Sequence, residues 1–287
     1  MACVYPTSIG EALGALAAIP GAVPVAGCTD FYPSLGQRPL RHGIVDLSGV
    51  RDASGIEDAG DHFRIGALTT WSEVIAADLP PAFDGLKAAA RQVGGVQVQN
   101  AGTLGGNLCN ASPAADGVPP LLSLDAKVEL RALAGTRRLT LSDFLLGNRR
   151  TCRRADEILA AILVPKRAGP ASAIFLKLGA RAYLVISIAM VAAVIERDNR
   201  GAVARAGIAV GACSAVAQRL HDLEQALVGC RLGPDLARIV TPAHLAPLSP
   251  IGDLRGSADY RLDAVLTLVR RALLALTGTI PAEGPHP

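Results

Sequence analysis

Polar capping signals and helical hydrophobic spacing mark the helices of this chain. Residues 8–11, Ser-Ile-Gly-Glu, form a capping box before apolar residues at helical spacing, and residues 70–73, Thr-Trp-Ser-Glu, repeat that signal. A proline pair at residues 80–81 predicts a further helix through Ala90, because proline is favoured in the first helical turn. The pattern also predicts helices over residues 220–228 and 258–276.

Short apolar runs bounded by glycine, proline or aspartate predict the strands. Two of these runs flank residues 198–201, Asp-Asn-Arg-Gly, which are typical of a hairpin turn. Strands with helices between them come first and an antiparallel set follows, so we predict an α+β fold. The charged and turn-rich residues 166–170 predict a domain boundary. The predicted strands are residues 23–26, 44–47, 63–67, 127–133, 137–141, 158–164, 173–178, 186–196 and 204–211.

The stretch of residues 94–125 combines glycine with short hydrogen-bonding side chains. Gly105 and Gly106 lack β-carbons, so the backbone there can approach a ligand closely. Thr103 and Asn107 beside bare backbone N–H groups suit a phosphate or a sugar edge. The stretch contains neither the Walker pattern nor the dinucleotide Gly-x-Gly-x-x-Gly in its strand-to-helix setting. The alternative is a plain glycine turn, in which Asn and Ser are ordinary turn formers.

Two further motifs lie on either side of this stretch. Residues 25–31, Val-Ala-Gly-Cys-Thr-Asp-Phe, leave a predicted strand as a polar turn that can present N–H groups to phosphate. An ordinary strand-ending turn is the alternative. In residues 253–261, we expect Asp253, Arg255 and Tyr260 to pack and pair rather than to catalyse.

Together these motifs resemble the FAD-binding medium subunits of the molybdenum hydroxylases, which include xanthine dehydrogenase and carbon monoxide dehydrogenase. Residues 103–107, with 111–116 after them, are similar to the second flavin loop of this family, and residues 25–31 are similar to the first. The first loop of the family usually reads Gly-Gly-Thr-Asp. Cys28 replaces its second glycine here, and the loop is expected to tolerate it if residue 28 does not need a positive φ.

The resemblance implies a two-part FAD-binding domain of the PCMH/VAO type over residues 1–167, with subdomains of about 1–52 and 53–167. A smaller α+β domain of the CO dehydrogenase flavoprotein C-terminal type, with an antiparallel sheet, would follow over residues 168–287. FAD would be held without a covalent bond, since none of the five histidines lies in a proposed loop.

The resemblance also assigns residues to the cofactor. Residues 24–31 would surround the pyrophosphate of FAD, and residues 103–107 would form the second loop. Asp116 matches a family aspartate that contacts the cofactor, although a helix N-cap is the alternative. Lys177 matches a lysine beside the flavin, with a solvated strand lysine as the alternative. No catalytic residue and no metal ligand is expected. The implied contact residues are Pro24, Val25, Ala26, Gly27, Cys28, Thr29, Asp30, Phe31, Val93, Thr103, Leu104, Gly105, Gly106, Asn107, Asp116, Leu159 and Lys177.

Composition and charge narrow the possible functions. A net charge of +3 with dispersed arginines argues against nucleic acid, and we interpret the arginine pairs at 137–138 and 149–150 as solvated or partner-facing charge. The six cysteines have no zinc or iron–sulfur spacing and are expected to be free thiols of a reducing compartment. The longest apolar run, residues 183–195, is too short to span a bilayer. With no visible signal peptide, a cytoplasmic location is expected.

We therefore interpret the chain as an FAD-bearing electron-transfer subunit. It would pass electrons from [2Fe-2S] clusters on a small partner subunit through FAD to an external acceptor. Substrate oxidation would take place at a molybdenum cofactor on a large partner subunit, with a dimer of heterotrimers as the assembly. One alternative is a stand-alone FAD-dependent oxidoreductase of the same superfamily. Another is a non-catalytic nucleotide-binding assembly module.

Overall fold

The computed structural model describes residues 2–279, and these form two compact units that interleave along the sequence. The first unit comprises residues 2–77, 93–111 and 126–166, and the second comprises residues 78–92, 112–125 and 167–279. The last change of unit falls between Lys166 and Arg167. The division into domains near residue 167 stays a prediction. The predicted fraying of residues 278–287 lies almost entirely outside the described residues.

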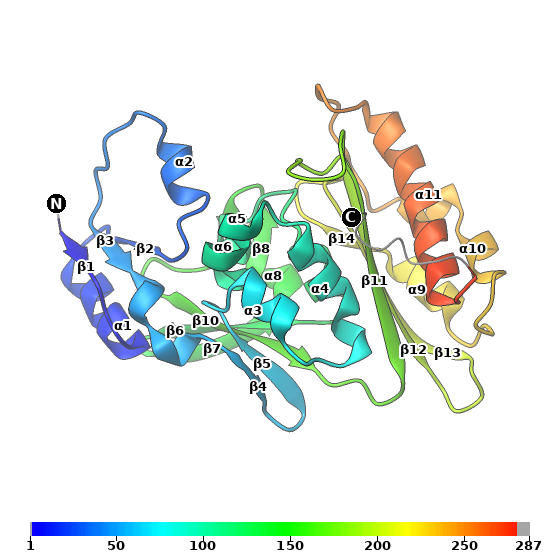
Figure 1. The fold of residues 1–287 in the computed structure, drawn as a ribbon, viewed down its shortest axis with the longest axis horizontal. Helices are drawn as coiled ribbons and strands as arrows, with labels where there is room; N and C mark the ends of the chain where they lie inside the picture. The colour runs from blue at the N-terminus through cyan, green and yellow to red at the C-terminus, as the bar shows by residue number, and fades with distance from the viewer. Residues whose placement is uncertain (1, 280–287) are drawn as a thin grey trace. The chain divides into compact units, whose positions relative to one another are not determined.

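The first unit contains two main sheets, which Figure 1 shows in blue to green. Their strands are β1 (Cys3–Val4), β2 (Val23–Val25), β3 (Ile44–Asp46), β4 (Ile56–Asp58), β5 (His62–Gly66), β6 (Lys127–Ala132), β7 (Gly135–Thr140) and β10 (Ile158–Pro165). The small sheet is parallel, in the order β1–β3–β2, so β2 lies at its edge. An edge position suits Pro24, which has no N–H for a second neighbour. The larger sheet is antiparallel, in the order β4–β5–β10–β6–β7.

Short helices and one hairpin complete the first unit. They are α1 (Ile9–Ala18), α2 (Phe31–Leu35), α3 (Trp71–Ala76), α5 (Val96–Ala101), α6 (Leu104–Asn110), α8 (Leu141–Phe144), and the hairpin β8 (Leu145–Gly147) with β9 (Arg150–Thr151). The apolar face of α1 is buried against β3 and β10, where Ile9 and Leu13 pack with Val45 and Ala160. This core fixes the edge strand β2 and the loop that follows it.

The two predicted capping boxes differ in the structure. At α3 both reciprocal bonds between Thr70 and Glu73 are present, as predicted. At α1 the Ser8 hydroxyl accepts a hydrogen bond from the Glu11 N–H, but the Glu11 carboxylate accepts from the N–H and hydroxyl of Thr7. The box predicted for residues 8–11 is therefore only half formed.

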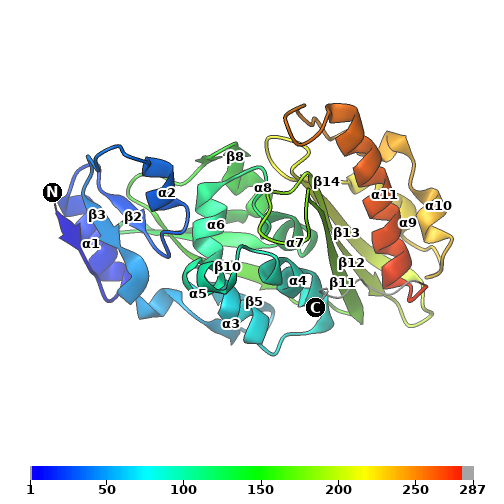
Figure 2. The same cartoon turned by 45° about the horizontal axis from the view of Figure 1, so that its top comes forward.

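The second unit is built on one antiparallel sheet that helices cover on both faces. Its elements are α4 (Asp84–Arg91), α7 (Val118–Ser123), β11 (Ala171–Leu178), β12 (Ala189–Arg197), β13 (Val203–Gly211), β14 (Gln218–Arg219), α9 (His221–Leu227), α10 (Leu236–Ile239) and α11 (Ala258–Leu276). One sheet face packs on α9 and α11, as Ile174 and Val191 do, whereas Phe175 and Met190 pack on Ala89 of α4. Figure 2 shows α11 lying along the strands. Double coverage explains why β12 is an almost unbroken apolar run.

Most predicted elements are confirmed, and the predicted helix over residues 258–276 has the observed bounds of α11. The α+β fold class is also confirmed. One prediction is wrong: the central glycine stretch, expected as a loop, forms the helices α5 and α6. The segment after Pro80 starts as a 3₁₀ turn, Pro81–Phe83, before α4 begins. No helix in residues 2–279 is long and apolar enough to cross a membrane.

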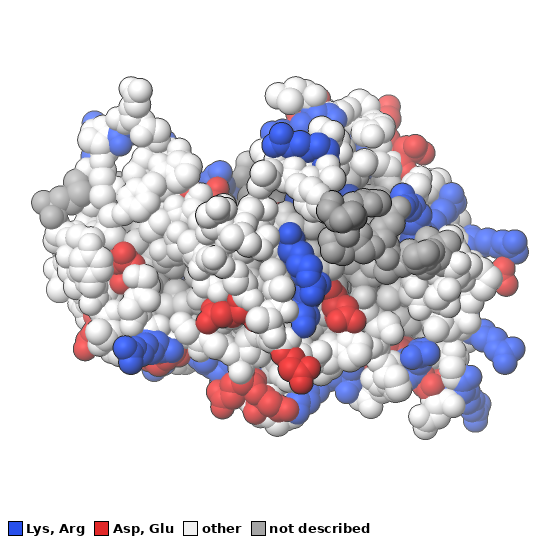
Figure 3. Space-filling view, viewed as in Figure 1, with Lys and Arg blue, Asp and Glu red and all other residues white. Residues whose placement is uncertain are grey.

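Several charged side chains of the chain are paired, and some of these pairs are buried. On the face in Figure 3, Lys and Arg are interspersed with Asp and Glu. Asp253 pairs with Arg255 and with the buried Arg261, at 2.9 and 2.7 Å, as expected for a packing role. The interpretation of Arg137 as solvated or partner-facing charge is wrong, because its charge is paired within the chain. Its guanidinium donates two hydrogen bonds, of 2.6 and 2.9 Å, to the Glu157 carboxylate, which is 3% exposed.

We expect Glu157→Gln to destabilise the protein by about 2 kcal/mol at neutral pH, because a buried charge-assisted hydrogen-bond pair is lost. The Arg137 hydrogen bonds lower the pKa of Glu157 below its usual value. Its contribution is therefore full above the unfolded-state pKa and is lost as pH falls through the folded-state pKa. Denaturant midpoints of wild type and variant, measured at pH 7 and in acid, should converge in acid. Glu57→Gln, at an exposed position of β4, is the control; an equal loss there would contradict the assignment.

Candidate functional site

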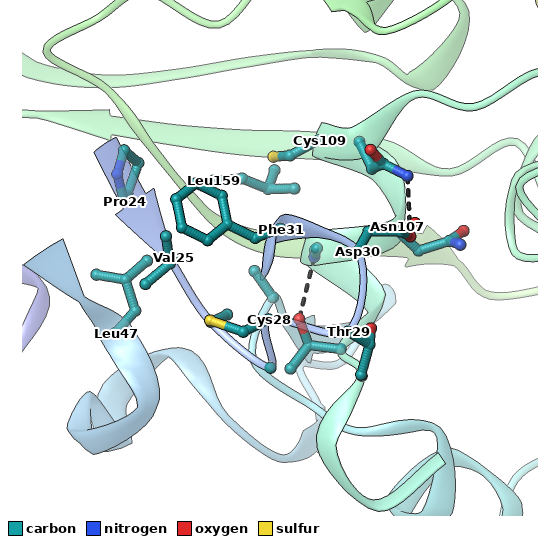
Figure 4. Close-up of a pocket in the computed structure, with 18 of the residues that line it drawn as sticks. Pro24, Val25, Cys28, Thr29, Asp30, Phe31, Leu47, Asn107, Cys109 and Leu159 are labelled. Atoms are coloured by element: carbon teal, nitrogen blue, oxygen red, sulfur yellow. Dashed lines mark hydrogen bonds between the residues drawn. The ribbon is translucent and has the colours of Figure 1, made fainter. Parts of the chain in front are cut away.

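A cavity of about 800 Å³ lies within the first unit, and segments far apart in the sequence line it. The loop after β2, the start of α6, the β8–β9 hairpin and the first residues of β10 all contribute. Figure 4 shows Cys28 of the loop and Phe31 of α2 around the same space as Asn107, Cys109 and Leu159. Binding sites for small molecules typically enclose roughly 300–1,000 Å³, so the cavity can take a large cofactor.

The first loop, residues 26–30, packs backbone against backbone. A β-carbon on Gly27 would lie 1.7 Å from the carbonyl oxygen of Ala101 at the end of α5, so only glycine fits there. Within residues 2–279, the backbone N–H groups of residues 27–30 have no protein acceptor. Asp30, the N-cap of α2, makes no side-chain capping bond. The loop therefore offers successive unpaired donors, an arrangement that binds anions.

Cys28 adopts a left-handed backbone conformation, with φ of 57°. The condition set for tolerating Cys28, that residue 28 does not need a positive φ, is therefore not met. For a residue with a β-carbon this conformation costs about 1 kcal/mol. Cys28, which stands where the family usually has glycine, thus adopts a strained conformation, and the loop keeps the turn that glycine would favour.

Both cysteines that line the cavity remain protonated at neutral pH. Burial, with a smaller contribution from Asp46, raises the pKa of the Cys28 thiol. Burial also raises the pKa of Cys109 to about 11. Because the thiolate is the nucleophilic form, neither side chain is activated for covalent attachment.

The glycine pair lies in the first turn of α6. Thr103 is the N-cap, and its hydroxyl accepts a hydrogen bond of 3.0 Å from the Gly106 N–H. The N–H groups of Leu104 and Gly105 donate to the carbonyls of Thr69 and Ala67, and that of Asn107 to Thr103. The expectation of bare N–H groups at this motif is therefore wrong. The unpaired donors belong to the first loop instead.

Different physical constraints explain why the two positions of α6 are occupied by glycine. A β-carbon on Gly105 would lie 2.6 Å from the backbone oxygen of Ala67, so this glycine allows the helix to pack on the strand end. A β-carbon on Gly106 would meet only the Thr103 hydroxyl, at 3.0 Å. Close approach to a ligand is thus possible at Gly106, whereas Gly105 serves packing.

Most predicted contact residues come together in this one cavity. Leu104 is an exception, because its side chain is fully buried in the core. Asp116 and Lys177 lie in the second unit and are not among the lining residues. The predicted residues that line the cavity are Pro24, Val25, Ala26, Gly27, Cys28, Thr29, Asp30, Phe31, Val93, Thr103, Gly105, Gly106, Asn107 and Leu159.

Asp116 and Lys177 form a buried ion pair in the second unit. The Lys177 Nζ donates to Asp116 Oδ1 at 2.9 Å, and the Ser187 hydroxyl donates to the same oxygen at 3.3 Å. The Lys177 side chain is 5% exposed and the N-cap of α7 is Gly117, so both alternative interpretations are wrong. Burial raises the pKa of the Asp116 carboxyl, although the Lys177 ammonium opposes the shift.

Three arginines in the cavity wall were missed by the sequence analysis. Arg149, Arg150 and Arg153 come from the β8–β9 hairpin and the turn after it, and one carboxylate, that of Asp30, lies among the lining residues. The interpretation of residues 149–150 as solvated or partner-facing charge is corrected accordingly. The signal was an arginine pair in a turn between apolar runs, but only the fold brings that turn beside α6.

The lining suits FAD in its chemistry. Unpaired N–H groups and arginines match the two ionised phosphates of a dinucleotide. Apolar side chains, among them Val25, Leu47 and Leu159, match the faces of its rings. When bound, FAD supplies two-electron and one-electron redox chemistry. The residues of the chain bind and orient it.

Comparison with known proteins agrees with this chemistry. Residues 1–167 match the family model of the FAD binding domain in molybdopterin dehydrogenase, and residues 174–276 match that of the CO dehydrogenase flavoprotein C-terminal domain. The nicotine 6-hydroxylase medium subunit of Paenarthrobacter nicotinovorans is 31% identical, over 94% of each chain.

Solved structures show the same similarity. A chain of the reconstituted CO dehydrogenase from Oligotropha carboxidovorans is 26% identical with a TM-score of 0.90, over 98% of both chains. A chain of quinoline 2-oxidoreductase from Pseudomonas putida 86 is also 26% identical, with a TM-score of 0.86, over 97% of this chain and 98% of that one. The protein is thus an FAD-binding subunit of an oxidoreductase. It belongs to the family of medium subunits of the molybdenum hydroxylases.

We expect Gly27→Ala to abolish or greatly weaken FAD binding, because the added methyl must separate the first loop from Ala101. Flavin absorbance after desalting would measure this. Gly14→Ala is the matched control: its β-carbon would meet nothing within 4 Å, and alanine favours its helix. Full flavin occupancy in a folded Gly27→Ala protein would contradict the loop assignment.

We expect Cys28→Gly to leave FAD binding intact and to change stability by at most about 1 kcal/mol, in the stabilising direction. Relief of the left-handed strain outweighs the added flexibility of glycine in the unfolded chain. Denaturant unfolding and flavin titration would measure both quantities. A strong loss of FAD would show that the Cys28 side chain itself is needed.

Proposed function

We propose that the chain holds FAD in the cavity of its first unit and relays electrons within a multi-subunit molybdenum hydroxylase. The observation that carries the proposal is the first loop: its residues 27–30 line a cavity of about 800 Å³, and their N–H groups have no acceptor in the described residues. These donors suit the diphosphate, and the cavity is large enough for a dinucleotide. The lining residues named above are the proposed contacts.

The proposal includes non-covalent attachment. The lining contains no histidine, and its two cysteines are held protonated by burial. Tight binding therefore depends on hydrogen bonds, charge and apolar contact. We also keep Asp116 and Lys177 as proposed cofactor contacts, since their buried pair is a fixed polar group of the kind that tunes a flavin.

Partner subunits complete the proposed function. The relatives are named medium subunits or medium chains, and this chain covers nearly all of their length. Within residues 2–279 no three His, Cys, Asp or Glu side chains gather as metal ligands. We therefore assign the molybdenum cofactor to a large partner and the [2Fe-2S] clusters to a small one, in a cytoplasmic dimer of heterotrimers. Electrons would enter from those clusters and leave to an external acceptor.

Two alternatives predict different behaviour. A stand-alone FAD-dependent oxidoreductase would turn over a substrate without partners. A non-catalytic assembly module would bind a nucleotide without redox activity. Neither has an observation in its favour, and a purified chain that is yellow would already separate the module from the other two.

We expect the isolated chain, loaded with FAD, to pass electrons to an artificial dye but not to oxidise the substrate of its complex. Turnover should appear when the large and small subunits encoded with it are added. The measurement compares the lone chain, the pair of partners and the full mixture. Full substrate turnover by the lone chain would replace the relay by the stand-alone enzyme.

A further inference from the structure

We propose that Arg149 is the positioning residue that anchors the diphosphate of the cofactor and so favours a dinucleotide over riboflavin. The inference rests on the proposed function, because it assigns a role within the same cavity. The backbone conformation and the contacts of Arg149 in the structure point to this role.

Arg149 is held in place by a clasp at the end of α6. Its backbone N–H donates to the carbonyl of Ala111 at 2.8 Å, and its Nη1 donates to Asn110 Oδ1 at 2.9 Å. Asn110 in turn donates from Nδ2 to Asp30 Oδ2 at 3.0 Å. A chain of hydrogen bonds thus joins the hairpin, α6 and the first loop.

The backbone of Arg149 is strained, with φ of 53°. Side-chain-bearing residues adopt this conformation at a cost, and such strain gathers at functional sites. A glycine or asparagine would satisfy the turn without strain. The strain therefore favours a role for the arginine side chain where the turn places it.

The guanidinium of Arg149 also has donors to spare. Asn110 is its one acceptor within the described residues, which leaves the Nε and Nη2 groups available beside the cavity. Arg153 differs, because its Nη1 is bonded to the carbonyls of Arg154 and Glu157. Arg150 is paired with Gly147 in the hairpin, but its side chain makes no hydrogen bond or ion pair in the described part of the chain. Arg149 alone among the three is joined by its side chain, through Asn110, to Asp30 of the first loop.

Charge supports a phosphate ligand. Asp30 would repel a diphosphate at the mouth of the loop, and the Asn110 bridge links its carboxylate to the Arg149 cation. A planar guanidinium with two spare donors matches the paired oxygens of a phosphate. Riboflavin has no phosphate, so it would gain nothing from this contact.

The test uses the full chain freed of flavin and titrated with FAD, ADP and riboflavin. Arg149→Gly removes the guanidinium while relieving the strained backbone, so the fold should keep or gain thermal stability. We expect the variant to bind FAD and ADP about tenfold more weakly, or weaker still, and to bind riboflavin with unchanged affinity. The affinity of FAD should also depend less on salt in the variant.

Two further variants sharpen the comparison. Arg149→Lys keeps the positive charge but lacks the planar guanidinium with its paired donors. It should weaken the binding of FAD by an intermediate factor. Lys127→Gln removes an exposed cation outside the lining and should change nothing.

The outcomes distinguish a failure of the Arg149 inference from a failure of the proposed function. Unchanged FAD binding by Arg149→Gly, or an equal loss for riboflavin, would overturn the inference while the proposed function stands. A wild-type chain that binds no FAD at all would overturn the proposed function, and the inference with it.

Discussion

The cavity depends on one steric constraint, the contact between the first loop and the end of α5. Gly27 lies so close to Ala101 that any β-carbon would enter the carbonyl group. This contact fixes the loop while its own N–H groups remain without acceptors. Preorganised donors of this kind bind an anion without paying the cost of ordering a loop. The same glycine therefore permits the close packing and keeps the loop's donors in a fixed arrangement.

The neighbouring helix α6 has a different task. Its first N–H groups are all used within the protein, and Gly105 is needed for contact with Ala67. Helix α6 therefore forms a rigid wall, against which the first loop and the β8–β9 hairpin are held. The groups suited to an anion lie in those two segments, one with unpaired backbone donors and one with arginines. A motif rich in glycine can thus belong to a binding site mainly by shaping it.

The sequence predicted the elements of the fold well where periodicity and caps are local. The strands of the second sheet and α11 follow from such patterns. It failed where tertiary contacts decide. Whether a glycine faces a ligand or a backbone, as at Gly105, depends on a neighbour distant in sequence. The partners of Arg149 and Lys177 depend in the same way on contacts that no spacing encodes.

The interleaving of the two units has a consequence for how such a protein can be divided. The chain passes from one unit to the other after residues 77, 92, 111, 125 and 166. Helices α4 and α7 thus precede residue 167 in sequence but cover a face of a sheet that follows it. A cut at the sequence boundary would strip that face and leave both helices with bare apolar sides. The two sequence segments on either side of residue 167 are therefore not independent folding units. A segment exchanged between relatives would need apolar surfaces that match those of the segment that is kept.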